Sequence, residues 1–148
     1  MKKRSKNDLE ISNLNKVYIN NNNSVTALKN ISFNVKKGAM LALLGPNGAG
    51  KSTLINILSG IVNKSSGAIA INGFDVDKEI RSAKLSIGVV PQELVMDPYF
   101  TPRETLNFQA GYYGIKKPDF IADKLLEKLK LKDKANAYVR NLSGGMKR

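Results

Sequence analysis

The sequence contains neither cysteine nor histidine among its 148 residues. Without cysteine, the chain has no disulfide framework and no thiolate ligands for a metal ion. Without histidine, it lacks the commonest general base and the commonest metal ligand in proteins. These two absences exclude disulfide-stapled scaffolds and thiolate metal sites from the candidate functions of this chain.

Long hydrophobic runs are also absent, since no apolar stretch approaches the roughly 18 to 20 residues that a membrane span needs. The N-terminus is basic, but polar residues follow at Asn7 and Asp8, where a signal peptide would need an apolar stretch. We therefore expect that the chain is neither exported nor membrane-spanning on its own.

Positive charge is abundant, with a formal net charge of +12. Such a balance fits a nucleic-acid or anionic-membrane partner, but it also fits a lysine-rich solvated surface. The lysines are spread along the chain and interrupted by acids such as Asp119, Asp123 and Glu127. No aromatic motif of the RNA-binding type accompanies them. We favour the solvated surface and expect no specific nucleic-acid partner.

Strand-like patterns dominate the first ninety residues. Residues 9–18 and 27–35 alternate apolar and polar side chains, which predicts an antiparallel pair around a polar turn at 20–24. Residues 67–73 predict a strand that ends in an Asn-Gly turn. The continuous apolar run 40–44 predicts a strand buried on both faces of a parallel sheet, and 86–90 predicts another strand, stopped by Pro91.

Helical patterns alternate with these strands and continue to the end of the chain. Residues 52–60 have apolar residues at helical spacing and a terminal glycine. A helix is predicted over 103–113, with Thr101 as N-cap and Pro102 at the first helical position. A second one is predicted over 119–129, with Ile121, Leu125, Leu126 and Leu129 on one face. The mixture of strands and helices predicts an α/β domain without repeats or linkers.

The most specific motif of the sequence follows the apolar run 40–44 and precedes the helix predicted from residue 52. It fits the pattern G-x-x-x-x-G-K-[ST] over Gly45, Pro46, Asn47, Gly48, Ala49, Gly50, Lys51 and Ser52. Glycines let backbone N–H groups approach an anionic triphosphate, and the following helix directs its positive end at the phosphates. Lys51 supplies a charge to the β and γ phosphates, and the Ser52 hydroxyl is a ligand for Mg²⁺.

Together with Thr53, this loop resembles the phosphate loop of ATP-binding cassette (ABC) ATPases, and three further landmarks stand in that family's order. Tyr18 lies upstream, residues 89–92 end in Gln92, and the segment Leu142, Ser143, Gly144, Gly145 and Met146 resembles the family's signature motif. Met146 stands where that motif usually has glutamine. The resemblance covers the chain from about residue 9 onward.

The resemblance implies a role for each landmark. Tyr18 stacks on adenine, while Gln92 reaches Mg²⁺ or a water near the γ-phosphate and joins Lys51 as a catalytic residue. The signature, with a helix beginning just after it, caps the ATP of a second subunit in a head-to-tail dimer. The implied cofactors are ATP and Mg²⁺.

The implied fold is a P-loop ABC nucleotide-binding domain with an antiparallel β subdomain, a parallel core sheet and a helical subdomain. Residues 1–8 form a basic tail, 9–92 form the phosphate-loop core, and 93–148 form the helical subdomain. No apolar run in the chain ends in the family's catalytic Asp-Glu, and no switch histidine is present. We therefore expect an incomplete domain that does not turn over ATP by itself, and whose run 40–44 exposes apolar surface.

The segment after Gln92 resembles exporter ATPases that work with type-2 ABC permeases. This likeness implies an ATP-binding subunit that is cytoplasmic and peripheral to the inner face of a membrane, held there by a permease. Candidates for the permease contact are Asp97, Tyr99, Phe100 and Arg103. The alternatives are a soluble ABC ATPase without a transport role and a non-catalytic remnant that binds nucleotide only.

Overall fold

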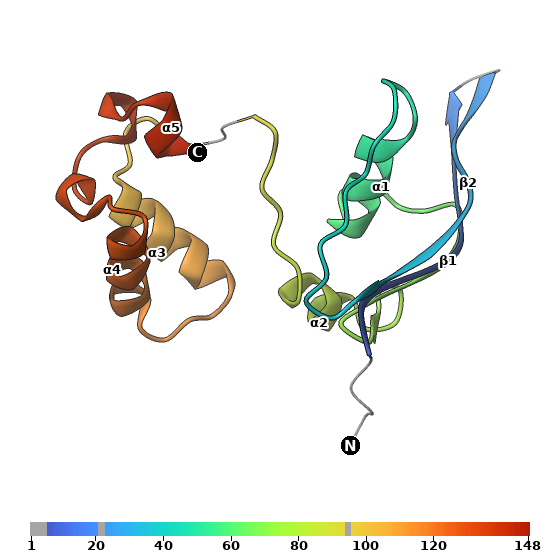
Figure 1. Cartoon of the computed structure of the whole chain (residues 1–148), viewed down its shortest axis with the longest axis horizontal. Coiled ribbons are helices and arrows are strands. Elements are labelled where there is room, and N and C mark those ends of the chain that lie inside the picture. Colours follow the sequence, from blue (N-terminus) through green and yellow to red (C-terminus); the bar gives the residue numbers. More distant parts are fainter. Residues whose placement is uncertain (1–5, 21–22, 94–95) are drawn as a thin grey trace. The chain divides into compact units, whose positions relative to one another are not determined.

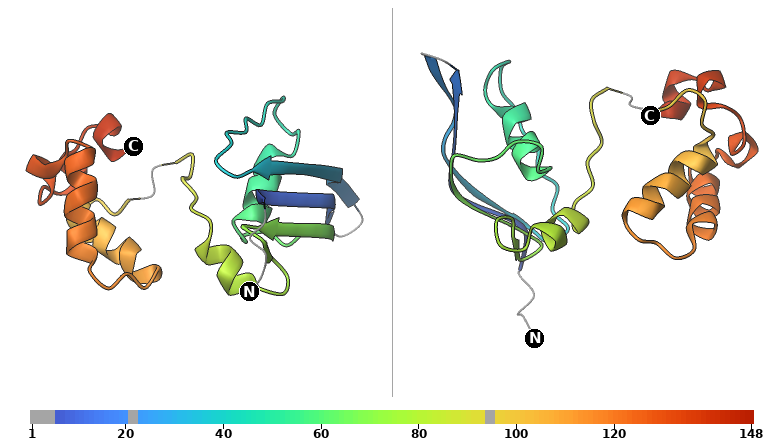
Figure 2. Two further views of the ribbon diagram at one scale, coloured as in Figure 1. Left: turned by 60° about the horizontal axis from the view of Figure 1, so that its bottom comes forward. Right: turned by 180° about the vertical axis from the view of Figure 1, so that it is seen from behind.

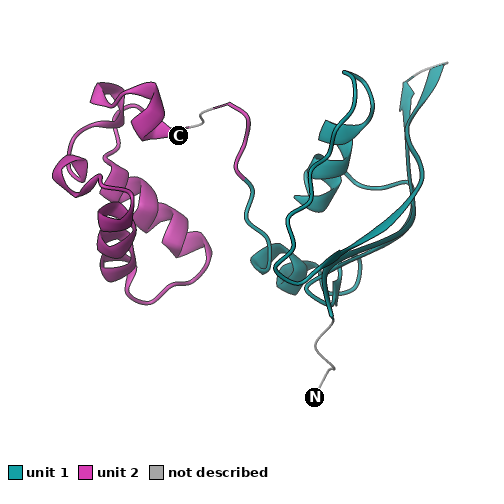
Figure 3. Ribbon diagram, viewed as in Figure 1, with its two compact units in different colours: residues 1–89 teal, residues 90–148 magenta. Residues whose placement is uncertain are grey.

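A computed structural model describes residues 6–20, 23–93 and 96–148. The chain divides into two compact units, residues 1–89 and 90–148, and each is described by itself (Figures 1 and 3). Most of the basic tail expected over 1–8 and the middle of the turn expected at 20–24 lie outside the described residues.

The first unit is built on a four-stranded sheet with the order β2-β1-β3-β4. The strands are β1 (Asn7–Asn20), β2 (Asn23–Lys36), β3 (Ser66–Ile71) and β4 (Phe74–Asp75), and all neighbours pair antiparallel. Ile11 pairs with Phe33 and Tyr18 with Val25, so the antiparallel pair predicted from the alternating pattern is confirmed.

Helix α1 (Lys51–Leu58) packs against one face of this sheet, which Figure 2 shows in its left view. Its buried residues Leu54 and Ile57 join a core formed by Ile11, Leu14, Leu28, Ile69, Ile71 and, from α2 (Ile80–Leu85), Ala83. Ile69 and Ile71 lie two apart on β3 and share a face, as alternation predicts. Ile11 and Leu14 are three apart, and the irregularity between them, with Asn13 at a φ of 49°, places both in the core. This core holds α1 against the sheet.

The hairpin between β3 and β4 turns at Asn72 and Gly73, with φ of 51° and 80°. Positive φ at both central residues is typical of the tight turn whose twist matches its flanking strands. The Asn-Gly turn predicted from the sequence is confirmed.

Two predicted strands are wrong. Residues 40–44 and 86–90 form no strand in the described part of the chain, and no parallel pair occurs there. Met40 is fully exposed and Leu44 is 92% exposed, so the run is not buried on either face. A strand needs a neighbour for its N–H and C=O groups, and none of the four strands pairs with these runs. The exposed apolar surface expected at 40–44 is confirmed.

The second unit consists of helices and short turns. These are α3 (Pro102–Tyr112), α4 (Pro118–Lys128), the 3₁₀ turns η1 (Lys132–Lys134) and η2 (Val139–Asn141), and α5 (Gly144–Lys147). Thr101 caps α3 through a reciprocal pair of contacts with Glu104, and Pro102 begins the helix, as predicted. No helix within the described residues is long and apolar enough to cross a membrane.

The apolar face predicted for α4 is narrower in the structure. Of its four members only Leu126 is buried, and Ala122 is the other buried residue of the helix. Ile121 and Leu125 line a shallow hollow beside α3 instead. The pattern predicted the correct side of the helix but not the width of the contact, because α3 is a single helix and covers only a strip of α4.

Candidate nucleotide-binding site

The glycine-rich loop connects the extended segment 39–44 to α1. Gly48 and Gly50 adopt φ of 82° and 85°, a conformation that side-chain-bearing residues rarely adopt. The loop closes on itself through a hydrogen bond from the Ala49 N–H to the Pro46 carbonyl at 3.3 Å. The residues from Asn47 to Ala49 are exposed, so the loop presents its backbone to solvent.

The N-terminus of α1 lies immediately after this loop. Its N-cap is Gly50, and no side chain caps the helix. The first intrahelical hydrogen bond runs from the Leu54 N–H to the Gly50 carbonyl at 2.9 Å. The N–H groups of the first turn have no intrahelical partners, and they carry the positive end of the helix dipole. The arrangement can therefore receive an anionic oxygen without displacing a cap.

Lys51 begins α1 and folds its side chain back over the loop. Its ammonium group donates hydrogen bonds to the carbonyls of Gly45, at 2.7 Å, and Pro46, at 2.6 Å. The positive charge thus lies on the same loop as the N–H groups of the first helical turn. Ser52, next along the helix, is exposed.

The loop is fixed to the sheet at Gly50. A Cβ atom at this position would lie 2.5 Å from the Ala27 carbonyl oxygen and 2.8 Å from a methyl carbon of Leu28. Both neighbours belong to β2, so the junction between the loop and α1 packs directly against that strand. A Cβ atom on Gly48, in contrast, would have no neighbour within 4 Å.

Tyr18 lies near the end of β1 and pairs with Val25 of β2. Ala27, two residues further along β2, is the contact of Gly50, so Tyr18 and the loop belong to the same end of the sheet. The tyrosine is 41% exposed, and the ammonium of Lys16 lies 4.7 Å from the centre of its ring. Lys16 is not among the site residues predicted from the sequence, and the irregularity of β1 between Lys16 and Val17 hides its place beside Tyr18 from a simple alternating pattern.

Gln92 and the signature residues belong to the second unit. Gln92 is exposed, and its backbone carbonyl accepts a hydrogen bond from the Arg148 guanidinium at 2.9 Å. Leu142 is buried, and the Ser143 hydroxyl accepts a hydrogen bond from the Met146 N–H at 3.3 Å. Ser143 is therefore the N-cap of α5, which begins at Gly144. The prediction that a helix begins just after the motif is wrong, because the helix begins inside it.

The oxygen ligands expected for Mg²⁺ suit that ion chemically. Mg²⁺ prefers hydroxyl, amide and carboxylate oxygens and is usually held by one or two protein ligands together with phosphates and waters. The Ser52 hydroxyl, exposed on the first turn of α1, fits this pattern. Within the described residues no group of three or more His, Cys, Asp or Glu side chains is placed to hold a metal ion.

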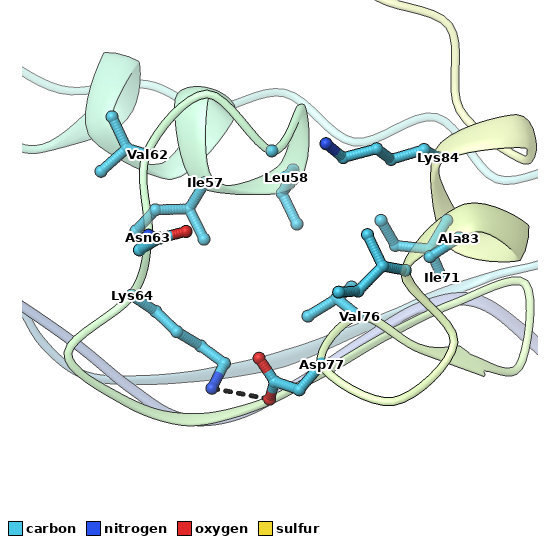
Figure 4. Close-up of a pocket in the computed structure, with 12 residues that line it drawn as sticks. Ile57, Leu58, Val62, Asn63, Lys64, Ile71, Val76, Asp77, Ala83 and Lys84 are labelled. Atoms are coloured by element: carbon cyan, nitrogen blue, oxygen red, sulfur yellow. Dashed lines mark ion pairs between the residues drawn. The ribbon is translucent and has the colours of Figure 1, made fainter.

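A cavity of about 290 Å³ lies at the other end of α1, between that helix, β3 and α2 (Figure 4). Its walls are mostly apolar, with Ile57, Ile71 and Ala83 among them. At its rim Lys64 and Asp77 form an ion pair at 2.8 Å. None of the residues predicted from the sequence as site residues lines this cavity.

Comparison with known proteins identifies the family. The sequence profile described as "ABC transporter" matches residues 28–148, which is most of the chain and includes the loop and the signature segment. The chain belongs to the ABC transporter family. Membership confirms the resemblance inferred from the loop, Gln92 and the signature, and the family implies ATP binding and ATP hydrolysis.

Two ABC relatives are similar over most of the chain. It is 42% identical over 142 residues to the linearmycin resistance ATP-binding protein LnrL of Bacillus subtilis, covering 95% of the chain and 44% of the relative. It is 45% identical over 120 residues to the Nod factor export ATP-binding protein I of Burkholderia thailandensis, covering 80% and 40%. The chain thus spans about two fifths of the length of these relatives.

Solved ABC structures agree with the fold. One is the dimeric, post-hydrolysis state of an ATP-binding cassette bound to ADP and phosphate, with a TM-score of 0.79 and 25% identity over 94% of this chain and 65% of that one. Another is an ATP-binding subunit of an ABC transporter, with a TM-score of 0.79 and 30% identity over 94% and 57%. The fold class predicted from the sequence is confirmed as that of an ABC nucleotide-binding domain.

Proposed function

We propose that this chain is the ATP-binding part of an ABC transporter subunit that couples ATP binding and hydrolysis to export through a partner permease. The observation that carries the proposal is the uncapped N-terminus of α1, with the Lys51 ammonium held over the adjoining loop. The relatives named for Nod factor export and linearmycin resistance support an exporter.

The triphosphate of ATP binds along residues 45–53 in this proposal. The first-turn N–H groups of α1 and the Lys51 ammonium replace the water around its oxygens, and both interactions strengthen with the negative charge of the ligand. Tyr18 offers its ring to the adenine. Ser52 is the proposed Mg²⁺ ligand of the first unit, and the ion would neutralise charge on the phosphates when it is bound. The role of Gln92 at Mg²⁺, which the family resemblance implies, stays a prediction.

A second subunit and a permease complete the proposed assembly. The signature residues Leu142 to Met146 contact the ATP bound to the second subunit in a head-to-tail dimer. Among the candidates for the permease contact, Tyr99 and Phe100 are exposed and support that role. The Arg103 side chain forms an ion pair with Asp123 at 2.7 Å and so joins α3 to α4. The intact protein is then peripheral to the inner face of a membrane, and fractionation with and without the co-expressed permease tests that location.

Substitution of Lys51 by alanine tests the nucleotide site. Charge-assisted hydrogen bonds contribute about 1.5–3 kcal/mol each, so Lys51→Ala should weaken Mg-ATP binding by at least about tenfold. Adenosine has no phosphate and should bind equally to both forms. Isothermal titration with each ligand measures the difference, and Lys84→Ala, an exposed lysine on α2, is the matched control. An equal loss for ATP and adenosine would show that Lys51 does not bind phosphate.

A further inference from the structure

The guanidinium of Arg140 contacts two tyrosine rings of the second unit. Its central carbon is 5.4 Å from the ring centre of Tyr99 and 5.1 Å from that of Tyr138. The rings are 67% and 47% exposed, so both are open to solvent while they hold the cation. A planar guanidinium can lie against two aromatic faces at once, which an ammonium cannot do equally well.

Backbone hydrogen bonds join the same two segments. The Val139 N–H donates to the Phe100 carbonyl at 2.8 Å, and the Arg140 N–H donates to the Pro98 carbonyl at 3.1 Å. Residues 98–100 thereby run alongside η2. The pairing of these segments rests on both the main chain and the tyrosine–arginine contacts.

The signature follows η2 without an intervening loop. The Leu142 N–H donates to the Val139 carbonyl at 3.1 Å, and the side chains of Val139 and Leu142 are both buried. Ser143, the next residue, caps α5. Hydrogen bonds therefore connect the exposed segment 98–100 to η2, and η2 to the start of the signature.

We propose that Arg140 is a positioning residue that sets the orientation of Ser143 and Gly144 relative to the exposed segment 98–100. Displacement of Tyr99 by a bound partner then displaces the signature, because the guanidinium and two backbone hydrogen bonds join them. That the signature contacts ATP rests on the proposed function. The contacts that join the segment 98–100 to the signature lie within the second unit and do not depend on that function.

Amide hydrogen exchange of the 148-residue chain tests the link. Arg140→Met keeps the aliphatic stem and removes the guanidinium, and it should raise exchange about threefold to tenfold at the hydrogen-bonded amides of Asn141, Leu142 and Met146. Tyr99→Leu should have a smaller effect in the same direction, because the contact with Tyr138 remains, and the double variant should add little to Arg140→Met. Tyr99→Phe retains the ring face and should leave exchange at wild-type rates. Lys124→Met, an exposed lysine on α4, is the matched control and should also leave it unchanged.

Exchange at Leu126, in the buried part of α4, shows whether a variant has merely unfolded the unit. Wild-type exchange at Asn141, Leu142 and Met146 in Arg140→Met, or additive effects of Arg140→Met and Tyr99→Leu, would overturn the proposal. So would equal acceleration at Leu126 and at the signature. Mg-ATP binding by the same samples is expected to stay within about twofold of wild type, because the phosphate loop lies in the other unit. Absence of ATP binding in the wild-type chain would contradict the proposed function and leave the link intact.

Discussion

A Cβ atom on Gly50 would lie 2.5 Å from the carbonyl oxygen of Ala27. The glycine-rich loop of this ABC chain thus turns into α1 directly against the backbone of β2, at a position where φ is 85°. Glycine is required here for two independent reasons, the left-handed backbone and the missing side chain. Gly48 shares the first reason but not the second, since its surroundings are open.

This difference predicts unequal effects of two alanine substitutions. Gly48→Ala should lower the free energy of unfolding by about 1–2 kcal/mol through backbone strain. Gly50→Ala should cost clearly more, because β2 or the loop has to shift in addition, and it should also weaken Mg-ATP binding. Urea unfolding of both variants measures the difference. Equal destabilisation would show that the loop moves freely away from Ala27.

The cap of α3 predicts a dependence of stability on acid pH. The Thr101 N–H and hydroxyl hold the pKa of Glu104 below its usual value of 4.5. The folded state therefore binds its proton less readily than the unfolded state, so the contribution of Glu104 is complete above about pH 4.5 and disappears as pH falls through the lowered pKa. Glu104→Gln keeps a side chain that can accept from Thr101 and should remove this part of the acid dependence.

Thermal unfolding between about pH 3 and pH 7 compares the two forms. Thr101→Ala is the companion variant, and it should cost about 0.5–2 kcal/mol at neutral pH by removing the cap itself. Asp123 adds to the loss of stability at acid pH, because the hydrogen bond that it accepts from Arg103 lowers its pKa. A Glu104→Gln profile identical to the wild type would assign the whole acid dependence to other carboxylates.

Steady-state ATP turnover by this 148-residue chain should be absent. The chain contains no histidine and no apolar run that ends in Asp-Glu. Phosphoryl transfer depends on positioned charges, and loss of an acid–base group alone typically costs about 10² to 10⁴ in rate. Phosphate release from the purified chain measures turnover, with Lys51→Ala as the control for contaminating ATPase. Robust turnover that disappears in Lys51→Ala would place the catalytic groups within the residues present.

The exposed run 40–44 predicts self-association of this chain. Met40 and Leu44 lie almost completely in solvent, beside an extended backbone that pairs with no strand among the described residues. Leu44→Lys should therefore reduce concentration-dependent light scattering without lowering the melting temperature. Ile61→Lys, at an exposed position outside the run, is the matched control and should change scattering less. Lower stability of Leu44→Lys would indicate that the side chain packs against other residues.

Much of the fold could be predicted from local patterns. The strand pair, the Asn72-Gly73 turn and the Thr101 cap depend on a few neighbouring residues, and each appears as predicted. The run 40–44 carried an equally clear pattern and formed no strand, because a buried parallel strand depends on a neighbour rather than on its own sequence. Helix α2 was missed because its six residues are too few to show a helical period.

The same distinction applies to the candidate site. The loop and the start of α1 follow from the spacing of Gly45, Gly50 and Lys51, since glycine and a helix start are local features. The contacts of Arg140 with Tyr99 and Tyr138 could not be predicted, because Tyr99 and Arg140 lie far apart in the sequence, with α3 and α4 between them. Contacts of this kind depend on how α3 and α4 pack, which no local pattern specifies.

The two hydrogen bonds of Lys51 to its own loop set a threshold for ligands. An anion that recruits this ammonium has to outcompete the carbonyls of Gly45 and Pro46, and it gains only the difference between the old bonds and the new ones. A monovalent anion such as chloride offers little beyond what the carbonyls already provide. A polyphosphate also engages the N–H groups of α1, so several gains offset one loss. We expect the affinity of the loop to rise steeply with the negative charge of the ligand, and we expect simple anions such as chloride to bind weakly.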